Sequence, residues 1–334
     1  MPKFLIIRLS SIGDIIQCMG IVGGIRQQFP SAEIHWIARS DMAETLSIDP
    51  RIDKVWSFNN REGIGGLLKL CNKLKSEEYD YIYDAHSNIR SNIIKLKLGK
   101  PFSSAPRIIT RSKERLKRAL LFGFGINRFP KPFIGVESFR KPLSKWGITK
   151  FDDSFEGYKF PEAITTKFAG FIGKNSITLI PSANWEMKRW PVNHWRRLIE
   201  LLPEYQFVVL GGPTDSFCSD IAAAAPERTI NMAGKSSIME SSYIVAISRV
   251  VVSGDTGFLH SADLLKVPAL ALMGPTAFGF PARKSSEILS LDMKCRPCTK
   301  DGRGRCKDSL YQRCLVDITP ETVAQRVRKI LPID

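Results

Sequence analysis

Apolar residues in the first part of the chain form short continuous runs that alternate with longer segments of helical spacing. Within Lys3–Leu9 the apolar residues run together without alternation, which is typical of a buried strand in a parallel sheet. A helical pattern follows over Ile15–Phe29 and ends at Pro30. Further strands are predicted at Glu33–Ala38, Val55–Phe58 and Tyr79–Tyr83, and further helices around Met42–Leu46 and over Gly65–Ser76. Strands that alternate with helices predict a doubly wound parallel sheet with right-handed crossovers.

The same alternation returns after a basic, less regular stretch and a polar segment, Gly147–Pro161. The predicted strands of this second part are Ser176–Ile180, Phe207–Leu210, Thr229–Asn231, Val250–Ser253 and Ala269–Met273. The predicted helices are Pro191–Leu202, Asp215–Ala225, Ile238–Ile247, Gly257–Leu265 and, last, Pro320–Leu331. The sequence does not repeat strongly, but the architecture does. We therefore predict an α/β protein of two Rossmann-like domains facing a central cleft, over residues 1–155 and 156–334.

Composition and charge narrow the class of protein. With 334 residues, 43% of them hydrophobic and 25% charged, the chain is not collagen-like, of low complexity or disordered. Lys and Arg number 49 against 33 for Asp and Glu, a net charge of +16. Such a surplus points to an anionic partner, namely nucleic acid, phosphorylated lipid headgroups or nucleotides, and a solvated basic surface is the alternative. The apolar stretch Phe4–Ile7 is too short for a signal peptide, which leads us to expect a cytoplasmic protein.

The first candidate for chemistry is Ser10-Ser11-Ile12-Gly13-Asp14, between the first strand and its helix. This junction lies at the carboxyl end of a strand, where ligands of α/β proteins bind. The dinucleotide fingerprint G-x-G-x-x-G is absent. Asp14 has two interpretations: it caps the helix, or it is a general base that accepts a hydroxyl proton.

Two loops of the second part carry groups suited to phosphate. Pro181–Pro191 contains Ser182 and the cations Lys188 and Arg189, which could donate to phosphate oxygens or simply be solvated. In Ser253–His260 a buried strand ends in Gly-Asp-Thr-Gly and a helix begins at once. Glycine lets a backbone approach an anion closely, and the first N–H groups of the helix donate to it. Gly211–Asp215 and Gly274-Pro275-Thr276 occupy equivalent strand ends.

Taken together, these loops resemble the bacterial glycosyltransferases of family 9, the lipopolysaccharide heptosyltransferases. The resemblance covers nearly the whole chain and is carried by Arg8–Asp14, Lys188–Pro191, Ser253–His260 and Gly274–Thr276. It implies a GT-B fold and inverting transfer of L-glycero-D-manno-heptose from its ADP-linked form. The implied acceptor is the lipid A–Kdo inner core of lipopolysaccharide or a growing heptose chain. In many proteins of this fold the last helix, here Pro320–Leu331, packs back on the first domain.

The resemblance also implies roles for individual residues. Asp14 would be the catalytic base, and Lys188 would meet the diphosphate of the donor. The remaining donor-binding residues would be Ser182, Asp215, Asp255, Thr256, Gly257 and His260. The sequence departs from the family at Ala183, where a second hydroxyl residue is common, and at Asp215, where the family often has Glu.

The acceptor is expected to be anionic, and a basic segment over Arg107–Arg118 leads into the apolar residues Ala119–Phe122. Such a segment suits phosphate and carboxylate groups at an anionic membrane surface, and a solvated helix face is the alternative. The predicted acceptor-binding residues are Ser10, Gly13, His86, Arg107, Arg111 and Arg115. We expect peripheral contact with the inner face of the cytoplasmic membrane. Nucleic acid is disfavoured because helix-turn-helix, RNA-recognition and KH signatures are missing.

Catalysis is expected to need no cofactor, because no Asp-x-Asp stands at a strand end and Asp152-Asp153 lies in the polar linker. Cys295, Cys298, Cys306 and Cys314 could close a structural zinc site, or they could be free thiols or disulfides. Two rival functions remain. One is a related transferase with another nucleotide sugar or acceptor, and the other is a non-catalytic protein that binds anions or nucleic acid.

Overall fold

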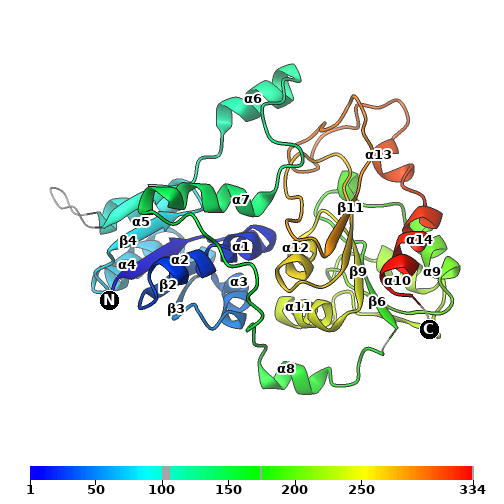
Figure 1. Cartoon of the computed structure of the whole chain (residues 1–334), viewed down its shortest axis with the longest axis horizontal. Coiled ribbons are helices and arrows are strands. Elements are labelled where there is room, and N and C mark those ends of the chain that lie inside the picture. Colours follow the sequence, from blue (N-terminus) through cyan, green and yellow to red (C-terminus); the bar gives the residue numbers. More distant parts are fainter. Residues whose placement is uncertain (100–105, 174, 333–334) are drawn as a thin grey trace. The chain divides into compact units, whose positions relative to one another are not determined.

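The computed structural model describes residues 1–99, 106–173 and 175–332. The chain divides into two compact units (Figure 1). Unit 1 comprises Met1–Arg115 and Val136–Pro161, and unit 2 comprises Leu116–Gly135 and Glu162–Asp334. This differs from the expected single boundary at 155/156, because residues 116–135 pack with the second unit although residues of the first unit flank them in the sequence.

Unit 1 is built on a parallel sheet of five strands in the order β3-β2-β1-β4-β5. Its strands are β1 (Lys3–Ile7), β2 (Glu33–Arg39), β3 (Lys54–Phe58), β4 (Tyr81–Asp84) and β5 (Arg107–Thr110). Its helices are α1 (Ile12–Met19), α2 (Val22–Gln28), α3 (Ser40–Ala43), α4 (Gly63–Lys75), α5 (Ile89–Leu98) and α7 (Gly135–Arg140). Two longer 3-10 turns, Glu44–Ile48 and Lys141–Trp146, belong to the same unit. The order reverses between β1 and β4, so the switch point of the sheet lies between these two strands.

The predicted helix Ile15–Phe29 is in fact two helices, α1 and α2, which meet at Gly20. A Cβ atom at Gly20 would lie 2.5 Å from Cγ2 of Val136. The break therefore lets α7 approach α1 closely, a contact between residues far apart in the sequence.

Unit 2 has a six-stranded parallel sheet in the order β11-β10-β9-β6-β7-β8. Its strands are β6 (Ser176–Ile180), β7 (Gln206–Val209), β8 (Thr229–Asn231), β9 (Val250–Gly254), β10 (Ala269–Leu272) and β11 (Ser286–Leu289). Its helices are α6 (Arg115–Phe124), α8 (Glu162–Lys167), α9 (Val192–Leu201), α10 (Phe217–Ala222), α11 (Ile238–Ile247), α12 (Gly257–Leu264), α13 (Arg313–Val316) and α14 (Pro320–Ile330). Counted from the first strand of each unit, both sheets share the order 3-2-1-4-5, so the architecture repeats as predicted, and the second switch point lies between β6 and β9.

Both faces of the unit 2 sheet are buried, which explains the unbroken apolar runs of its strands. Successive side chains of a strand point to opposite faces, so Val250 and Val252 join one core cluster and Val251 the other. Helix α14 packs against α9 and adds Val323 and Val327 to the first cluster. The last helix, for which a return to the first domain was expected, therefore buries its apolar side within unit 2.

Segment 116–135 joins unit 2 through a cluster of aromatic rings. The ring of Phe278 lies 6.1, 5.0 and 4.9 Å from the rings of Phe122, Phe129 and Phe133. Ile134 forms a parallel bridge with Phe280, and the guanidinium of Arg118 lies 4.1 Å from the centre of the Phe278 ring. These contacts give the segment its place in the second unit.

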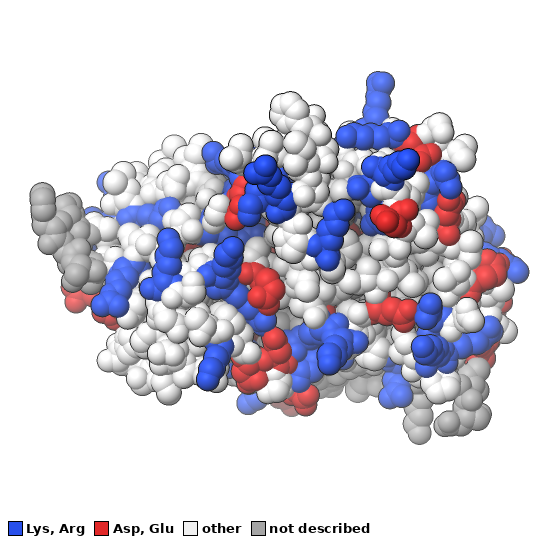
Figure 2. Space-filling model, turned by 45° about the horizontal axis from the view of Figure 1, so that its top comes forward, with Lys and Arg blue, Asp and Glu red and all other residues white. Residues whose placement is uncertain are grey.

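The charged surface is mixed on the face that Figure 2 shows, where Lys and Arg side chains are spread widely and Asp and Glu side chains stand among them. Within the described residues, no helix combines the length and the apolar character that crossing a bilayer requires.

Candidate functional site

The loops that follow β1 and β4 flank the switch point of unit 1, at what we call its carboxyl edge. Arg8 follows β1 and is almost fully buried, and its Nη1 donates to the carbonyl of Ala85 at 2.8 Å. Its Nη2 pairs with the carboxylate of Asp14, to which the Ser11 hydroxyl also donates at 3.1 Å. The Asp14 side chain keeps 37% of its surface exposed. Asp14 is thus held by two neighbours and remains accessible to a ligand.

His86 and Arg111 lie at the same edge. Burial, followed by the positive charges of Arg8 and Lys113, lowers the pKa of His86 to about 4, so the imidazole is neutral at pH 7. Arg111 directly follows β5, donates to the Ser138 hydroxyl at 2.6 Å and stacks on Phe139. Burial, and next the charge of Arg8, lower the pKa of Arg111. The edge therefore holds buried positive charge that would favour an anion.

Two polar atoms at this edge lack a hydrogen-bond partner in the described part of the chain: Nε of Arg8 and Nδ1 of His86. Buried polar atoms are nearly always partnered in folded proteins, so exceptions often mark the place of a ligand or water.

Not every predicted acceptor residue belongs to this group. Ser10 and the buried Gly13 stand in the loop after β1 and at the start of α1, next to Asp14. Arg107 begins β5 beside Tyr81 and so lies at the other end of the strand from Arg111. Arg115 is exposed at the first position of α6. The structure thus separates the three arginines that sequence spacing had grouped.

The carboxyl edge of unit 2 holds a second group of charges, again around the switch point. Lys188 follows β6 and Asp255 follows β9, and Nζ of Lys188 lies 3.0 Å from the Asp255 carboxylate. The hydroxyl of Thr276, after β10, donates to the same carboxylate at 2.8 Å. A Cβ atom at Gly279 would lie 3.1 Å from Oδ1 of Asp255 and 3.6 Å from Nε2 of His260, which places these side chains around one point.

Helix α12 begins directly after Asp255, so its first turn lies beside this group of charges. Thr256 caps the helix by accepting the N–H of Leu259 at 3.3 Å, and Gly257 is its first residue. The N–H groups at a helix start attract anions. The structure therefore brings together Asp255, Thr256, Gly257, His260 and Lys188, which the sequence analysis assigned to the donor.

Ser182 and Asp215 form a neighbouring pair at the same edge. The Ser182 hydroxyl donates to Asp215 at 2.5 Å, and the backbone N–H of Gly212 donates to it at 2.8 Å. Arg189 holds Asp215 at 3.4 Å and the carbonyl of Ala183 at 2.8 Å. Asp215 thus organises the loops after β6 and β7.

Arg8 and Thr276 stand in motifs that the sequence analysis singled out, but neither was assigned a role in a site there. Arg8 carried a signal, because a charged side chain between the apolar run Phe4–Ile7 and Leu9 is expected to be buried. Thr276 carried a weaker one, because Gly-Pro-Thr marks many turns.

The predicted zinc site gains no support from the structure. All seven cysteines are free thiols, and in the described residues the four at 295–314 do not form a group of three whose sulfur atoms lie within 4.8 Å of one another.

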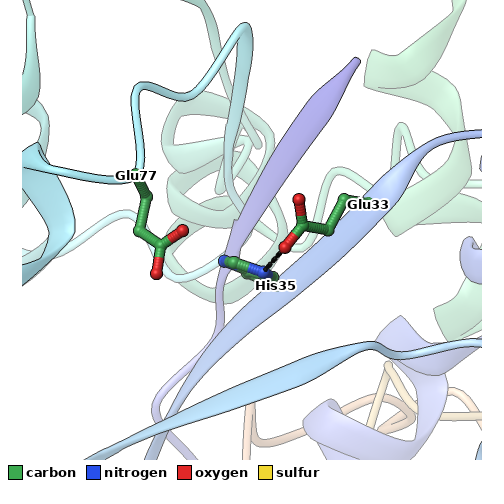
Figure 3. Close-up of side chains that lie close together, drawn as sticks. All are labelled: Glu33, His35 and Glu77. Atoms are coloured by element: carbon green, nitrogen blue, oxygen red, sulfur yellow. Dashed lines mark hydrogen bonds and ion pairs between the residues drawn. The ribbon is translucent and has the colours of Figure 1, made fainter. Parts of the chain in front are cut away.

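The group within the described residues that does meet this spacing is Glu33, His35 and Glu77 (Figure 3). It lies at the opposite, amino edge of the unit 1 sheet. The ammonium of Lys3 lies 2.9 Å from Glu77 and 3.3 Å from Glu33, and that of Lys54 lies 2.6 Å from Glu77. Lysines thus already supply the cations that these carboxylates need, so we interpret the group as a structural ion network.

Two doubly wound parallel sheets, each with charged loops at its switch point, define the GT-B fold of glycosyltransferases, as predicted. Solved structures share this fold over almost the full chain. Heptosyltransferase II of Escherichia coli, an ADP-heptose LPS heptosyltransferase by its description, has a TM-score of 0.74 at 21% identity and covers 98% of both chains. A family 9 glycosyltransferase from Veillonella parvula has a TM-score of 0.78 at 17% identity and covers 99% of this chain and 97% of its own.

The chain belongs to glycosyltransferase family 9 (heptosyltransferase), whose model matches residues 67–305. Among curated relatives, lipooligosaccharide heptosyltransferase 2 of Haemophilus ducreyi is 24% identical over 354 aligned positions, which cover 98% of this chain and 99% of the relative. The family inferred from the sequence motifs is thereby confirmed, and the protein is a glycosyltransferase.

Proposed function

We propose that the protein transfers heptose from ADP-L-glycero-D-manno-heptose to the inner core of lipopolysaccharide, either to lipid A–Kdo or to a heptose already attached. The names of its relatives support the sugar and the pathway. One observation in the structure supports the division of labour: a carboxylate beside buried cations lies at the switch point of unit 1, and a lysine beside a helix start lies at that of unit 2.

Unit 2 binds the nucleotide sugar in this proposal. The ammonium of Lys188 and the N–H groups at the start of α12 neutralise the diphosphate, and Lys188 exchanges its partner Asp255 for phosphate oxygens. Asp255, Thr256, Gly257 and His260 hold the nucleotide and the sugar. Ser182 lies on the phosphate side, and Asp215 lies near the ribose.

Unit 1 binds the acceptor. Arg111 and His86 contact an anionic group of the inner core, and Ser10 and Gly13 line the path to Asp14. The carboxylate of Asp14 accepts the proton of the acceptor hydroxyl while the hydroxyl oxygen bonds to the anomeric carbon. The bond from that carbon to the diphosphate breaks, and ADP leaves with the bonding electrons.

A single displacement of this kind inverts the anomeric centre. The positive charges around Lys188 stabilise the developing charge of the departing diphosphate, which is the role that a metal ion has in other transferases. The proposed reaction is therefore inverting and independent of metal.

We further place the reaction at the inner face of the cytoplasmic membrane. Leu116 and Phe124 of α6 keep 74% and 78% of their surfaces exposed, and Arg115 stands beside them. Exposed apolar side chains with basic neighbours suit peripheral contact with anionic lipid.

Thermal unfolding with ADP, UDP, GDP and CMP, each with and without EDTA, tests the donor. A nucleotide at about 100 times its dissociation constant stabilises the folded state by about 2.7 kcal/mol. We expect ADP to raise the unfolding temperature of the wild type but not of Lys188→Ala, with no effect of EDTA. A preference for UDP or GDP would reassign the donor, and an equal response of Lys188→Ala would remove Lys188 from the site.

Turnover tests the reaction itself. Purified protein with ADP-heptose and a lipid A–Kdo acceptor should release ADP and form a glycoside, and NMR of the product should show the opposite anomeric configuration from the donor. Retained configuration would contradict direct displacement. Loss of turnover in EDTA that added metal restores would contradict metal independence.

A further inference from the structure

The cysteine-rich segment between β11 and α13 has no role in the reaction proposed above. We call residues 295–312 the strap. It contains Cys295, Cys298 and Cys306, and little of it is helix or strand. Its contacts go to two loops at the carboxyl edge of unit 2, the loop after β10 and the loop after β6.

The strap is anchored on the loop after β10. The N–H groups of Cys298 and Thr299 donate to the carbonyl of Pro275 at 3.1 and 3.3 Å, and Thr299 forms a bridge with Thr276. The guanidinium of Arg296 donates to the carbonyls of Met273 and Gly274 at 2.8 and 2.7 Å. These bonds fix one end of the strap next to Thr276, which itself bonds Asp255.

From this anchor the strap reaches the loop that carries Lys188. The side-chain amide of Gln312 donates to the carbonyl of Glu186 at 2.9 Å, and the guanidinium of Arg303 lies 5.5 Å from the centre of the Trp185 ring. The backbone of Gly302 lies against the aliphatic part of Lys188, since a Cβ atom there would be 2.7 Å from Cγ and 2.8 Å from Cδ of the lysine.

Lys188 is enclosed from a second direction as well. A Cβ atom at Gly254, the last residue of β9, would lie 3.0 Å from the Lys188 carbonyl. Glycine at 254 and at 302 thus lets two backbones approach one lysine closely. A lysine side chain loses considerable conformational entropy when its ammonium is fixed, and packing that restricts it beforehand reduces the loss on binding.

We propose that the strap is a positioning element of the donor site, in which Gly302 holds the side chain of Lys188 where the donor diphosphate binds. This inference rests on the proposed role of Lys188 in binding that diphosphate. It predicts that a methyl group at 302 moves the ammonium and weakens nucleotide binding, although residue 302 itself touches no ligand.

Gly304 provides a matched control for Gly302. The two have φ angles of +104° and +95°, so alanine strains the backbone in the same way at both. At Gly304, however, a Cβ atom would meet nothing within 4 Å. By calorimetry, we expect Gly302→Ala to weaken ADP binding about tenfold, and Gly304→Ala to change it by less than about twofold. Equal effects of the two substitutions would overturn the proposal.

The double substitution Lys188→Ala with Gly302→Ala distinguishes a loss of Lys188 positioning from a general disturbance of the fold. Without Cγ and Cδ at position 188, alanine at 302 no longer displaces the lysine side chain, and the next nearest atom is Cβ of Trp185 at 3.0 Å. In the Lys188→Ala background, Gly302→Ala should therefore leave ADP affinity unchanged. A further loss of affinity there would mean that Gly302 acts by another route. If Lys188→Ala alone binds ADP as the wild type does, the proposed donor site itself is contradicted. This outcome is distinct from a failure of the positioning proposal.

Gln312→Asn tests the same element should Gly302→Ala not fold. Gln312 has a φ of +58°, a conformation that Asn tolerates, and the shorter side chain cannot reach the carbonyl of Glu186. We expect weaker ADP binding by about threefold or more, with no further loss in the Lys188→Ala background. Unchanged affinity in Gln312→Asn would contradict the proposal.

Discussion

The two edges of the unit 1 sheet carry the same kinds of side chain, but they differ in how far the hydrogen bonds of these side chains are satisfied within the protein. At the amino edge the His35 imidazole binds Glu33 at 2.7 Å and the Tyr79 hydroxyl at 2.9 Å, and that hydroxyl accepts the indole N–H of Trp56 at 3.0 Å. The ammonium groups of Lys3 and Lys54 supply the remaining partners of the two carboxylates. At the carboxyl edge Arg8 and His86 each keep one buried nitrogen with no partner among the described residues.

This difference in hydrogen bonding, and not residue type, distinguishes the structural ion network from the proposed binding site. A network that is complete within the protein stabilises the fold and has little to offer a ligand. An edge with buried positive charge and incomplete hydrogen bonding is stabilised further when an anion arrives. A search by metal-ligand spacing alone selects the first edge, whereas, of these two edges, the second holds the buried nitrogens that lack a partner among the described residues.

The largest expected effect is at Asp14. Asp14→Ala should lower kcat by about 10²- to 10⁴-fold, the usual contribution of a general base, and should leave ADP affinity unchanged. Steady-state kinetics and calorimetry measure the two quantities. Retained turnover would remove the general-base assignment and with it the main functional difference between the edges.

Arg111 and Arg107 sharpen the comparison, because they stand at the two ends of one strand. Arg111→Gln should raise KM for the acceptor by about tenfold to a hundredfold, since it removes a charged hydrogen-bond donor from the anion site. KM for the donor should not change. Arg107→Gln is the control and should leave both values near those of the wild type. A larger effect at Arg107 would place the acceptor away from the carboxyl edge.

His86 makes stability depend on pH in a defined direction. Its pKa is about 4 in the folded chain against 6.5 ordinarily, so between these values the unfolded chain binds more protons. Stability should therefore fall as pH decreases from 6.5 to 4. After allowance for partial solvent exposure, we expect a loss of about 1–2 kcal/mol that His86→Asn removes. Denaturant unfolding across this range measures it, and an unchanged slope in the variant would assign the pH dependence to another group.

The smallest effect should come from the amino edge. The hydrogen bonds from Lys54 and Lys3 lower the pKa of Glu77 from 4.5 to about 2. Glu77→Gln should therefore cost about 1 kcal/mol of stability at pH 7, and the difference from wild type should shrink as pH falls from 4.5 towards 2. Its kcat and both KM values should match those of the wild type. A clear fall in kcat would mean that this edge takes part in the reaction.

Elements with a strong local pattern could be predicted closely from the sequence. Strand Ser176–Ile180 and helix Ile238–Ile247 were predicted with the bounds that the structure has. Their signals are local: continuous apolar residues in one, and Ser237 with Glu240 as a capping box before an apolar run in the other. The loops proposed to bind the donor were singled out for a similar reason, since Gly-rich turns directly follow buried strands.

Features that depend on distant contacts could not be predicted in this way. The division of the first long helix at Gly20 depends on Val136, and the place of Gly302 against Lys188 depends on how the strap crosses a loop more than a hundred positions earlier. The separation of Arg107 from Arg111 depends on where β5 begins and ends. In each case the sequence shows the residue and the fold decides its neighbours.

The assignment of residues 116–135 to unit 2 has a consequence for how the chain is made. The chain passes between the units at 115/116, 135/136 and 161/162. During synthesis, Phe122 and Phe129 emerge roughly 150 residues before Phe278, so their cluster closes late and with a long loop. A truncated protein that begins at Glu162 would leave Phe278 without these rings. Because each unit consists of two separate segments of the chain, neither unit can be expressed whole as one uninterrupted fragment.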